Sequence, residues 1–205
     1  MDRREFFRRS FSKASETVVK HVDAKVSARA ARWIRPPYAI VELEFLLACT
    51  RCNACIDACP HDVIFPLASR LGVEVAGTPS LDLLHQGCHL CEDWPCVNAC
   101  ETKALSLPEV NKAQTLSFPN LAHAEIDTKT CLPYLGPECG ACVEVCPVPD
   151  ALTLQLEKPV IDQVLCVGCG MCHEACILEP KAVRITSLHS HLIEDEHSNE
   201  SPDNV

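Results

Sequence analysis

Residues 49–60 read Cys-Thr-Arg-Cys-Asn-Ala-Cys-Ile-Asp-Ala-Cys-Pro, so three cysteines recur at every third position and a fourth follows four positions later. A C-x2-C-x2-C loop curls around a cubane so that three thiolates reach three irons. The last step is one helical turn, which points the fourth cysteine away from that cluster and toward another one. The stretch therefore predicts that its cysteines ligate two iron–sulfur clusters, three of them one cluster and the fourth another.

The same motif occurs four times along the 205 residues. The repeats start 39, 43 and 35 residues apart, and such internal repetition indicates a chain built from similar units. All sixteen cysteines belong to the four groups. In chain order they are Cys49, Cys52, Cys55 and Cys59 (group I); Cys88, Cys91, Cys96 and Cys100 (group II); Cys131, Cys139, Cys142 and Cys146 (group III); Cys166, Cys169, Cys172 and Cys176 (group IV). We expect them to be the iron ligands of four [4Fe–4S] clusters.

Groups II and III contain insertions. Residues 92–95 separate the second and third cysteines of group II, and residues 132–138 separate the first and second of group III. Both insertions lengthen the loop and leave the final C-x3-C step intact, so we expect them to shape the cluster surroundings or a docking face. Trp94, inside the first insertion, either shields a cluster or packs in the core, and core packing is the commoner role for a tryptophan.

Short strands are predicted around the cysteine groups. Residues 151–156 alternate between apolar and polar as a strand does, and residues 182–185 do so after group IV. Residues 124–127 and 160–162 precede groups III and IV in the same way. The sequence thus predicts an α+β body over residues 36–188, made of tandem ferredoxin-like units with short β-hairpins and helical turns.

Zinc and disulfides are the alternatives for so many cysteines. Structural zinc sites use C-x2–4-C pairs that are a dozen or more residues apart, whereas here a third and a fourth cysteine follow at once. Disulfides require an oxidising compartment, and closely spaced cysteines are poorly placed to reach distant partners. Both alternatives are disfavoured.

The N-terminal segment differs from the body in charge and pattern. Residues 1–35 contain ten Lys/Arg and four Asp/Glu, whereas residues 36–205 contain eight and twenty-four. An acidic body argues against a nucleic-acid partner. Apolar residues recur at intervals of three and four and predict a long amphipathic helix within residues 1–35: Phe7, Phe11, Ala14, Val18, Val22, Val26, Ala30 and Trp33. This helix either packs on the protein's own core or docks on a partner protein or an anionic membrane surface.

The N-terminal residues and the lack of a long apolar run bear on the location of the protein. Residues 3–7, Arg-Arg-Glu-Phe-Phe, resemble the twin-arginine export motif, but charged residues follow in place of an apolar h-region. No run of 18 or more apolar residues occurs that could span a membrane. We therefore expect a cytoplasmic protein.

Residues 189–205 are acidic and rich in Ser and Asn, which predicts a disordered tail.

Three stretches carry a resemblance to a known family: Cys88 to Cys100 with its Glu-Asp-Trp-Pro insertion, the long-looped Cys131 to Cys139, and Cys172 to Ala182. Together they resemble the MauM/NapG ferredoxin-type proteins over residues 35–188, and residues 34–55 also resemble NapF, a cytoplasmic relative. The resemblance implies four [4Fe–4S] clusters. For NapG-type members it implies electron transfer beside a periplasmic oxidoreductase, and for NapF-type members it implies help in maturing a partner enzyme.

Two functions follow. The favoured one is a relay of single electrons between this chain and a partner oxidoreductase, because a pure assembly factor would not need four complete sites. The other is an accessory factor that assists cluster insertion into a partner enzyme. No Gly-rich dinucleotide loop, flavin motif or nucleophile–base pair is present, so we expect the chain not to be an enzyme in its own right.

The pairing of the groups is open from the residues alone. Either neighbours share clusters (I with II, III with IV) or the outer groups do (I with IV, II with III). An analogy with four-cluster subunits of molybdoenzymes favours the outer pairing. On that prediction Cys59 joins the first three cysteines of group IV and Cys176 joins those of group I. Likewise Cys100 joins the first three cysteines of group III and Cys146 joins those of group II.

Overall fold

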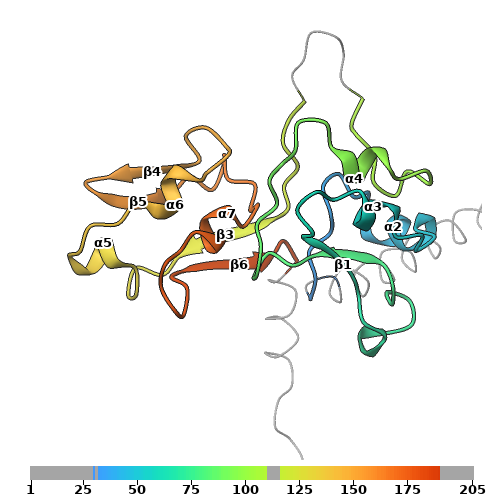
Figure 1. Ribbon diagram of the computed structural model, residues 1–205, viewed down its shortest axis with the longest axis horizontal. Coiled ribbons are helices and arrows are strands. Elements are labelled where there is room, and N and C mark those ends of the chain that lie inside the picture. Colours follow the sequence, from blue (N-terminus) through green and yellow to red (C-terminus); the bar gives the residue numbers. More distant parts are fainter. Residues whose placement is uncertain (1–29, 31, 110–115, 190–205) are drawn as a thin grey trace, which may run out of the picture.

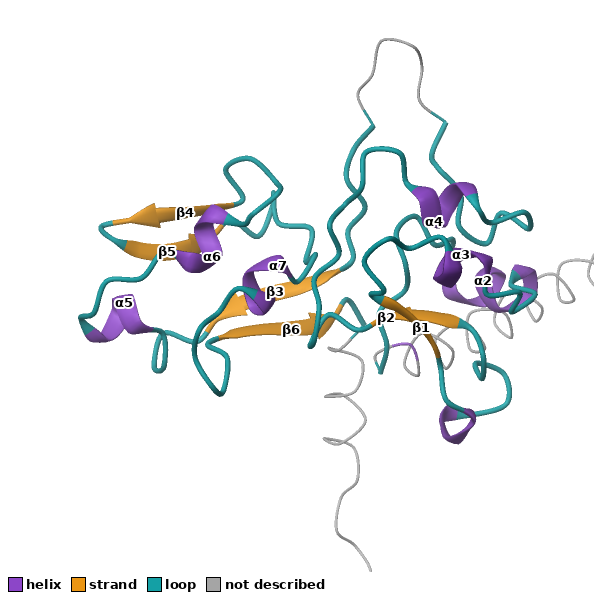
Figure 2. Cartoon of the chain, in the orientation of Figure 1, coloured by secondary structure: helices purple, strands orange, loops and turns teal. Residues whose placement is uncertain are grey.

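The computed structural model of the protein describes residue 30 and residues 32–109 and 116–189. Two units lie side by side, one built from residues 32–109 and the other from residues 116–189 (Figure 1). Each unit contains two of the four cysteine groups and a mixture of short helices and two-stranded sheets (Figure 2). The predicted α+β class with hairpins and helical turns is thereby confirmed.

The second unit is closed by a pairing of its first and last strands. β3 (Ala122–Ile126) runs antiparallel to β6 (Val183–Ser187), with Ala122 opposite Ser187. Between them, β4 (Leu152–Gln155) and β5 (Lys158–Ile161) form a hairpin. Its two turn residues both have positive φ, as a tight two-residue hairpin connection requires. The four predicted strands of this unit are therefore present.

The first unit repeats this plan with fewer hydrogen bonds. An isolated bridge between Ala39 and Leu105 stands where β3 and β6 stand in the second unit. β1 (Ile64–Pro66) pairs antiparallel with β2 (Pro79–Leu81) as the counterpart of the β4–β5 hairpin. A 3-10 helix, η1 (Ser69–Leu71), lies in the long connection between them. Proline at both strand ends removes ladder donors, which keeps this hairpin short.

Each cysteine group ends in a single helical turn, as its C-x3-C step predicts. The turns are α3 (Ala54–Asp57), α4 (Pro95–Asn98), α6 (Ala141–Glu144) and α7 (Met171–Glu174). The third cysteine of a group lies inside its turn, and the fourth follows two residues after the turn ends. Two further helices flank the groups: α2 (Glu42–Ala48) precedes group I, and α5 (Leu132–Leu135) occupies the insertion of group III.

The apolar core is continuous across the two units and surrounds the cysteines. Buried residues of the first unit, such as Phe45 and Leu83, belong to the same cluster as Ala122 and Val183 of the second. Buried cysteines from all four groups are part of it. Because the sequence has only ten aromatic side chains, aliphatic residues and cysteines make up most of this core.

The predicted N-terminal helix and acidic tail lie mostly outside the described residues. Residues 32–35 are described, and they belong to the packed body: Ile34 bridges to Leu81, and Trp33 is buried. The boundary predicted at residue 35 thus falls inside the folded part. No helix within the described ranges is long and apolar enough to cross a membrane.

Candidate iron–sulfur sites

The sixteen cysteines assemble into four quartets, each drawn from two groups. Three quartets line cavities whose other walls are almost wholly apolar. In the fourth, Cys49, Cys52 and Cys100 are close enough to Cys55 to affect its pKa. The quartets are Cys49, Cys52, Cys55 and Cys100 (quartet one); Cys59, Cys88, Cys91 and Cys96 (quartet two); Cys146, Cys166, Cys169 and Cys172 (quartet three); Cys131, Cys139, Cys142 and Cys176 (quartet four).

This arrangement contradicts the predicted outer pairing. Cys59 lies with Cys88, Cys91 and Cys96 of group II, not with group IV. Cys176 lies with three cysteines of group III. The physical reason is that each unit folds from a contiguous stretch of chain, in which α3 contacts α4 and α6 contacts α7. The fourth cysteine after each turn therefore reaches the site of the neighbouring group.

The quartets fit a bound group larger than a single metal ion. The cavities of quartets two, three and four are alike in size and in their lining by four cysteines, so the three sites suit the same occupant. A zinc ion needs four ligands at about 2 Å from one point, whereas these thiols stand around the wall of a cavity. Four thiols in an apolar enclosure are the donor set of a [4Fe–4S] cluster.

Left-handed backbone turns shape the cysteine loops. The residue before the second cysteine has positive φ in three groups, namely Arg51, Leu90 and Gly168, and the residue before the helical turn does so at Asn53, Trp94 and Gly170. Such turns point successive amides inward and form an anion-binding concavity. Backbone amides of Leu90 and Gly168 accordingly donate to the sulfurs of Cys88 and Cys166 and oppose the rise of their pKa values.

Burial raises the pKa of the least exposed thiols and so keeps these thiols protonated. It raises the pKa of Cys55, Cys88 and Cys142 to about 11, and the pKa of Cys96, Cys169 and Cys172 to about 12, with further increases from neighbouring cysteines. Four thiolates gathered at one such site therefore need a cationic group among them to be stable. Iron supplies that charge, and ligation displaces the thiol protons.

The two units use the same contact at the fourth cysteine of their second group. The amide of Leu105 donates to the sulfur of Cys100 at 3.4 Å, and the amide of Ala182 donates to that of Cys176 at 3.4 Å. Both donors lie where the chain returns to close its unit. In each unit, the returning segment thus holds in place the fourth cysteine of the second group, which completes the site of the first group.

Trp94 serves both roles that the sequence left open. Its side chain is 6 % exposed and packs edge-on against Tyr38 with 4.8 Å between ring centroids. It also lines the cavity of quartet two beside Cys91 and Cys96. The group II insertion therefore adds an aromatic wall to that site.

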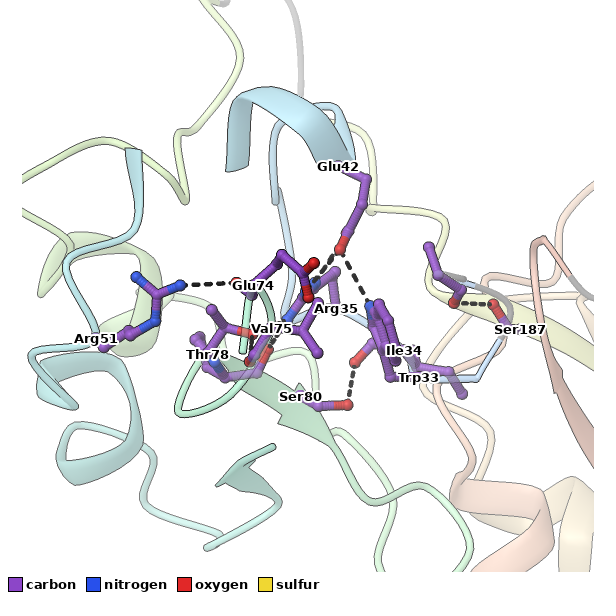
Figure 3. A network of polar contacts seen from close by, with 12 residues as sticks. Trp33, Ile34, Arg35, Glu42, Arg51, Glu74, Val75, Thr78, Ser80 and Ser187 are labelled. Carbon is purple, nitrogen blue, oxygen red and sulfur yellow. Dashed lines mark hydrogen bonds and ion pairs between the residues drawn. The ribbon is translucent and has the colours of Figure 1, made fainter. Parts of the chain in front are cut away.

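Sequence reasoning missed a buried ion pair that supports quartet one. The guanidinium of Arg35 lies 2.6 Å from the carboxylate of Glu42 and also donates to Thr78 and to the carbonyl of Pro79 (Figure 3). Trp33 donates to the same carboxylate at 3.2 Å. This network fixes α2, which leads directly into Cys49. The sequence gives little signal for this pair, because α2 carries two glutamates, Glu42 and Glu44, and only Glu42 is buried.

Comparisons with known proteins agree with the site. Residues 47–65 match the 4Fe-4S binding domain and residues 87–151 match the 4Fe-4S dicluster domain. The second match covers groups II and III, which are consecutive motifs but belong to different units of the fold. Cluster binding of the 4Fe-4S type is thus a property of this chain at the level of its domains.

Three relatives illustrate the similarity. The methylamine utilization ferredoxin-type protein MauM of Methylobacillus flagellatus is 38 % identical over 169 residues, which cover 77 % of this chain and 70 % of the relative. The ferredoxin-type protein NapG of Escherichia coli is 33 % identical over 168 residues, covering 76 % and 71 %. The ferredoxin-type protein NapF of the same organism is 32 % identical over 168 residues, covering 80 % and 90 %.

Proposed function

Because the chain belongs to the family of ferredoxin-type proteins that includes MauM, NapG and NapF, we propose that it binds four [4Fe–4S] clusters and relays single electrons through them to or from a partner oxidoreductase. Members of this family are electron carriers, so substrate chemistry belongs to the partner. The observation that carries the proposal is the gathering of all sixteen cysteines into four quartets.

The chain's own residues supply what such a relay needs. A [4Fe–4S] cluster, when bound, takes up and returns one electron at a reduction potential that its surroundings set. Here those surroundings are apolar walls and backbone amides that donate to cysteine sulfur. The two quartets of a unit are built from the same two cysteine groups. The two sites within a unit are therefore held close together.

Quartet one is the part of the relay that we propose to face the partner. Among the cysteines, all of which are described, Cys52 alone is exposed. Arg51 holds the adjoining loop by donating to the carbonyls of Glu74 and Ala76 at 2.7 and 2.9 Å (Figure 3 shows the first of these). A rigid loop with a ligand at the surface gives a partner the shortest approach to a buried redox site.

The proposal is tested by the metal and sulfide content of protein purified without oxygen. We expect about sixteen iron and sixteen acid-labile sulfide per chain, with electron paramagnetic resonance (EPR) signals of interacting reduced clusters after dithionite is added. Two to four zinc per chain without sulfide would instead indicate a zinc-built interaction module and would overturn the relay.

The cytoplasmic location and the docking role of residues 1–35 stay predictions, since they rest on residues outside the described ranges. Cell fractionation of the full chain tests the first. Recovery of the protein with the soluble cytoplasmic fraction is the expected result, and recovery from the periplasm contradicts it.

A further inference from the structure

The two units meet at a backbone contact between quartets two and three. The amide of Cys88 donates to the carbonyl of Cys169 at 2.7 Å. Cys88 belongs to quartet two in the first unit, and Cys169 belongs to quartet three in the second. Two ligands of different units thus face each other across a single hydrogen bond.

The approach of the two units at this contact depends on Gly87. Gly87 is buried, and its amide donates to a carboxylate oxygen of Glu174 at 2.7 Å. A Cβ at Gly87 would lie 2.8 Å from the backbone nitrogen and Cα of Met171, which is closer than real side chains come. Only glycine therefore permits this spacing, and Glu174 anchors it from the side of α7.

Further contacts join the two units beside Gly87, between α7 and the residue before it in the second unit and residues 83–84 in the first. Nε2 of His173 lies 3.2 Å from the carbonyl oxygen of Leu84, and its Nδ1 lies 2.6 Å from that of Val183. A Cβ at Gly170 would lie 3.1 Å from Cβ of Leu83. We call this set of contacts, from Leu83 to Cys88 and from Cys169 to Glu174, the seam.

From this geometry we propose that the seam is the path by which electrons cross between the two units, with Cys88 and Cys169 as its two ends and Gly87 and Glu174 as positioning residues. The inference rests on the proposed function. With clusters held by quartets two and three, one electron would pass from the reduced cluster to the oxidised one in either direction, and no bond would form or break. The electron comes from a reduced donor protein and ends on an oxidised acceptor protein.

The seam gives the four sites a linear order. Within the first unit, α3 with Cys55 of quartet one contacts α4 with Cys96 of quartet two. Within the second unit, α6 with Cys142 of quartet four contacts α7 with Cys172 of quartet three. Quartets one, two, three and four thus lie in a linear series, which we call the wire. The seam joins its two middle sites, quartets two and three. Without that step the chain would be two independent two-cluster carriers.

The experiment compares full-chain variants at the seam with a control in the equivalent helical turn. Gly87→Ala adds the clashing Cβ, Glu174→Ala removes the anchoring acceptor, and Glu174→Gln keeps an acceptor oxygen. Glu144→Ala is the matched control, because Glu144 ends α6 as Glu174 ends α7 and is exposed. Three quantities are measured for each: iron content, exchange of the Cys88 amide proton, and the EPR spectrum of the fully reduced protein.

We expect Gly87→Ala and Glu174→Ala to keep their iron, to lose protection of the Cys88 amide, and to lose the EPR splitting that arises between units, leaving the sum of two separate coupled pairs. Glu174→Gln and Glu144→Ala should match the wild type. If the amide loses protection while the spectrum is unchanged, the seam is not the path. If the amide stays protected in both seam variants, the two residues do not position it, and the proposal fails. Wild-type protein that lacks iron would instead count against the proposed function itself.

Discussion

Gly168→Ala is expected to remove about a quarter of the bound iron, which is one cluster of four, and to lower the free energy of unfolding by about 3 kcal/mol or more. Gly168 has a φ of +66°, and a Cβ there would lie 1.9 Å from the carbonyl oxygen of Ala122. The loop between Cys166 and Cys169 would have to move away from β3, where the amide of Leu121 now donates to Val167 at 2.8 Å. Iron analysis and urea denaturation under anaerobic conditions measure both effects.

Gly136→Ala is the control for this prediction. Gly136 also has a positive φ, of +123°, but a Cβ there would meet nothing within 4 Å. This substitution adds backbone strain without a clash, so it should retain the full iron content. Equal iron in the two variants would show that the close approach of Gly168 to β3 is not needed to shape quartet three.

Glu42→Ala is expected to cost about 3–5 kcal/mol of stability, because it leaves a buried guanidinium without its counter-ion. The side chains of Arg35 and Glu42 are 11 % and 5 % exposed, and Arg35 also lies 4.5 Å above the ring of Phe45. With the carboxylate gone, the guanidinium would lose its hydrogen bonds to Glu42 and keep those to the neutral oxygens of Thr78 and Pro79 (Figure 3). Urea denaturation of the iron-loaded protein measures the loss.

Two comparisons sharpen this second prediction. Glu44→Ala changes an exposed carboxylate on the same helix and should shift stability by no more than about 0.5 kcal/mol. The double variant Arg35→Met with Glu42→Leu removes both charges and should be more stable than Glu42→Ala alone. An effect of Glu42→Ala as small as that of Glu44→Ala would mean that the pair does not hold α2 in place.

The local structure was predictable from sequence because it depends on short spacings. A C-x3-C step is one helical turn, and all four turns form as predicted. Residues 151–156 alternate in polarity, and β4 forms within them. These features need no knowledge of distant parts of the chain.

The pairing of the groups was not predictable in the same way. A fourth cysteine leaves its own group in any pairing, and its destination depends on which helical turn packs beside it. The contacts of α3 with α4 and of α6 with α7 decide this, and they form only when each unit closes. Two other tertiary contacts follow no spacing rule and were not predictable from sequence either. They are the hydrogen bond between Cys88 and Cys169 and the ion pair between Arg35 and Glu42.

The most direct test of this account is the iron content of two quadruple variants of the full chain, purified without oxygen. Both replace Cys49, Cys52 and Cys55 with Ala, and each replaces one further cysteine: Cys100 in the first variant and Cys176 in the second. If neighbouring groups share their sites, the first variant loses one cluster and keeps about twelve iron, whereas the second loses two and keeps about eight. The reverse result, with about eight iron in the Cys100 variant and about twelve in the Cys176 variant, would contradict the pairing and the wire built on it.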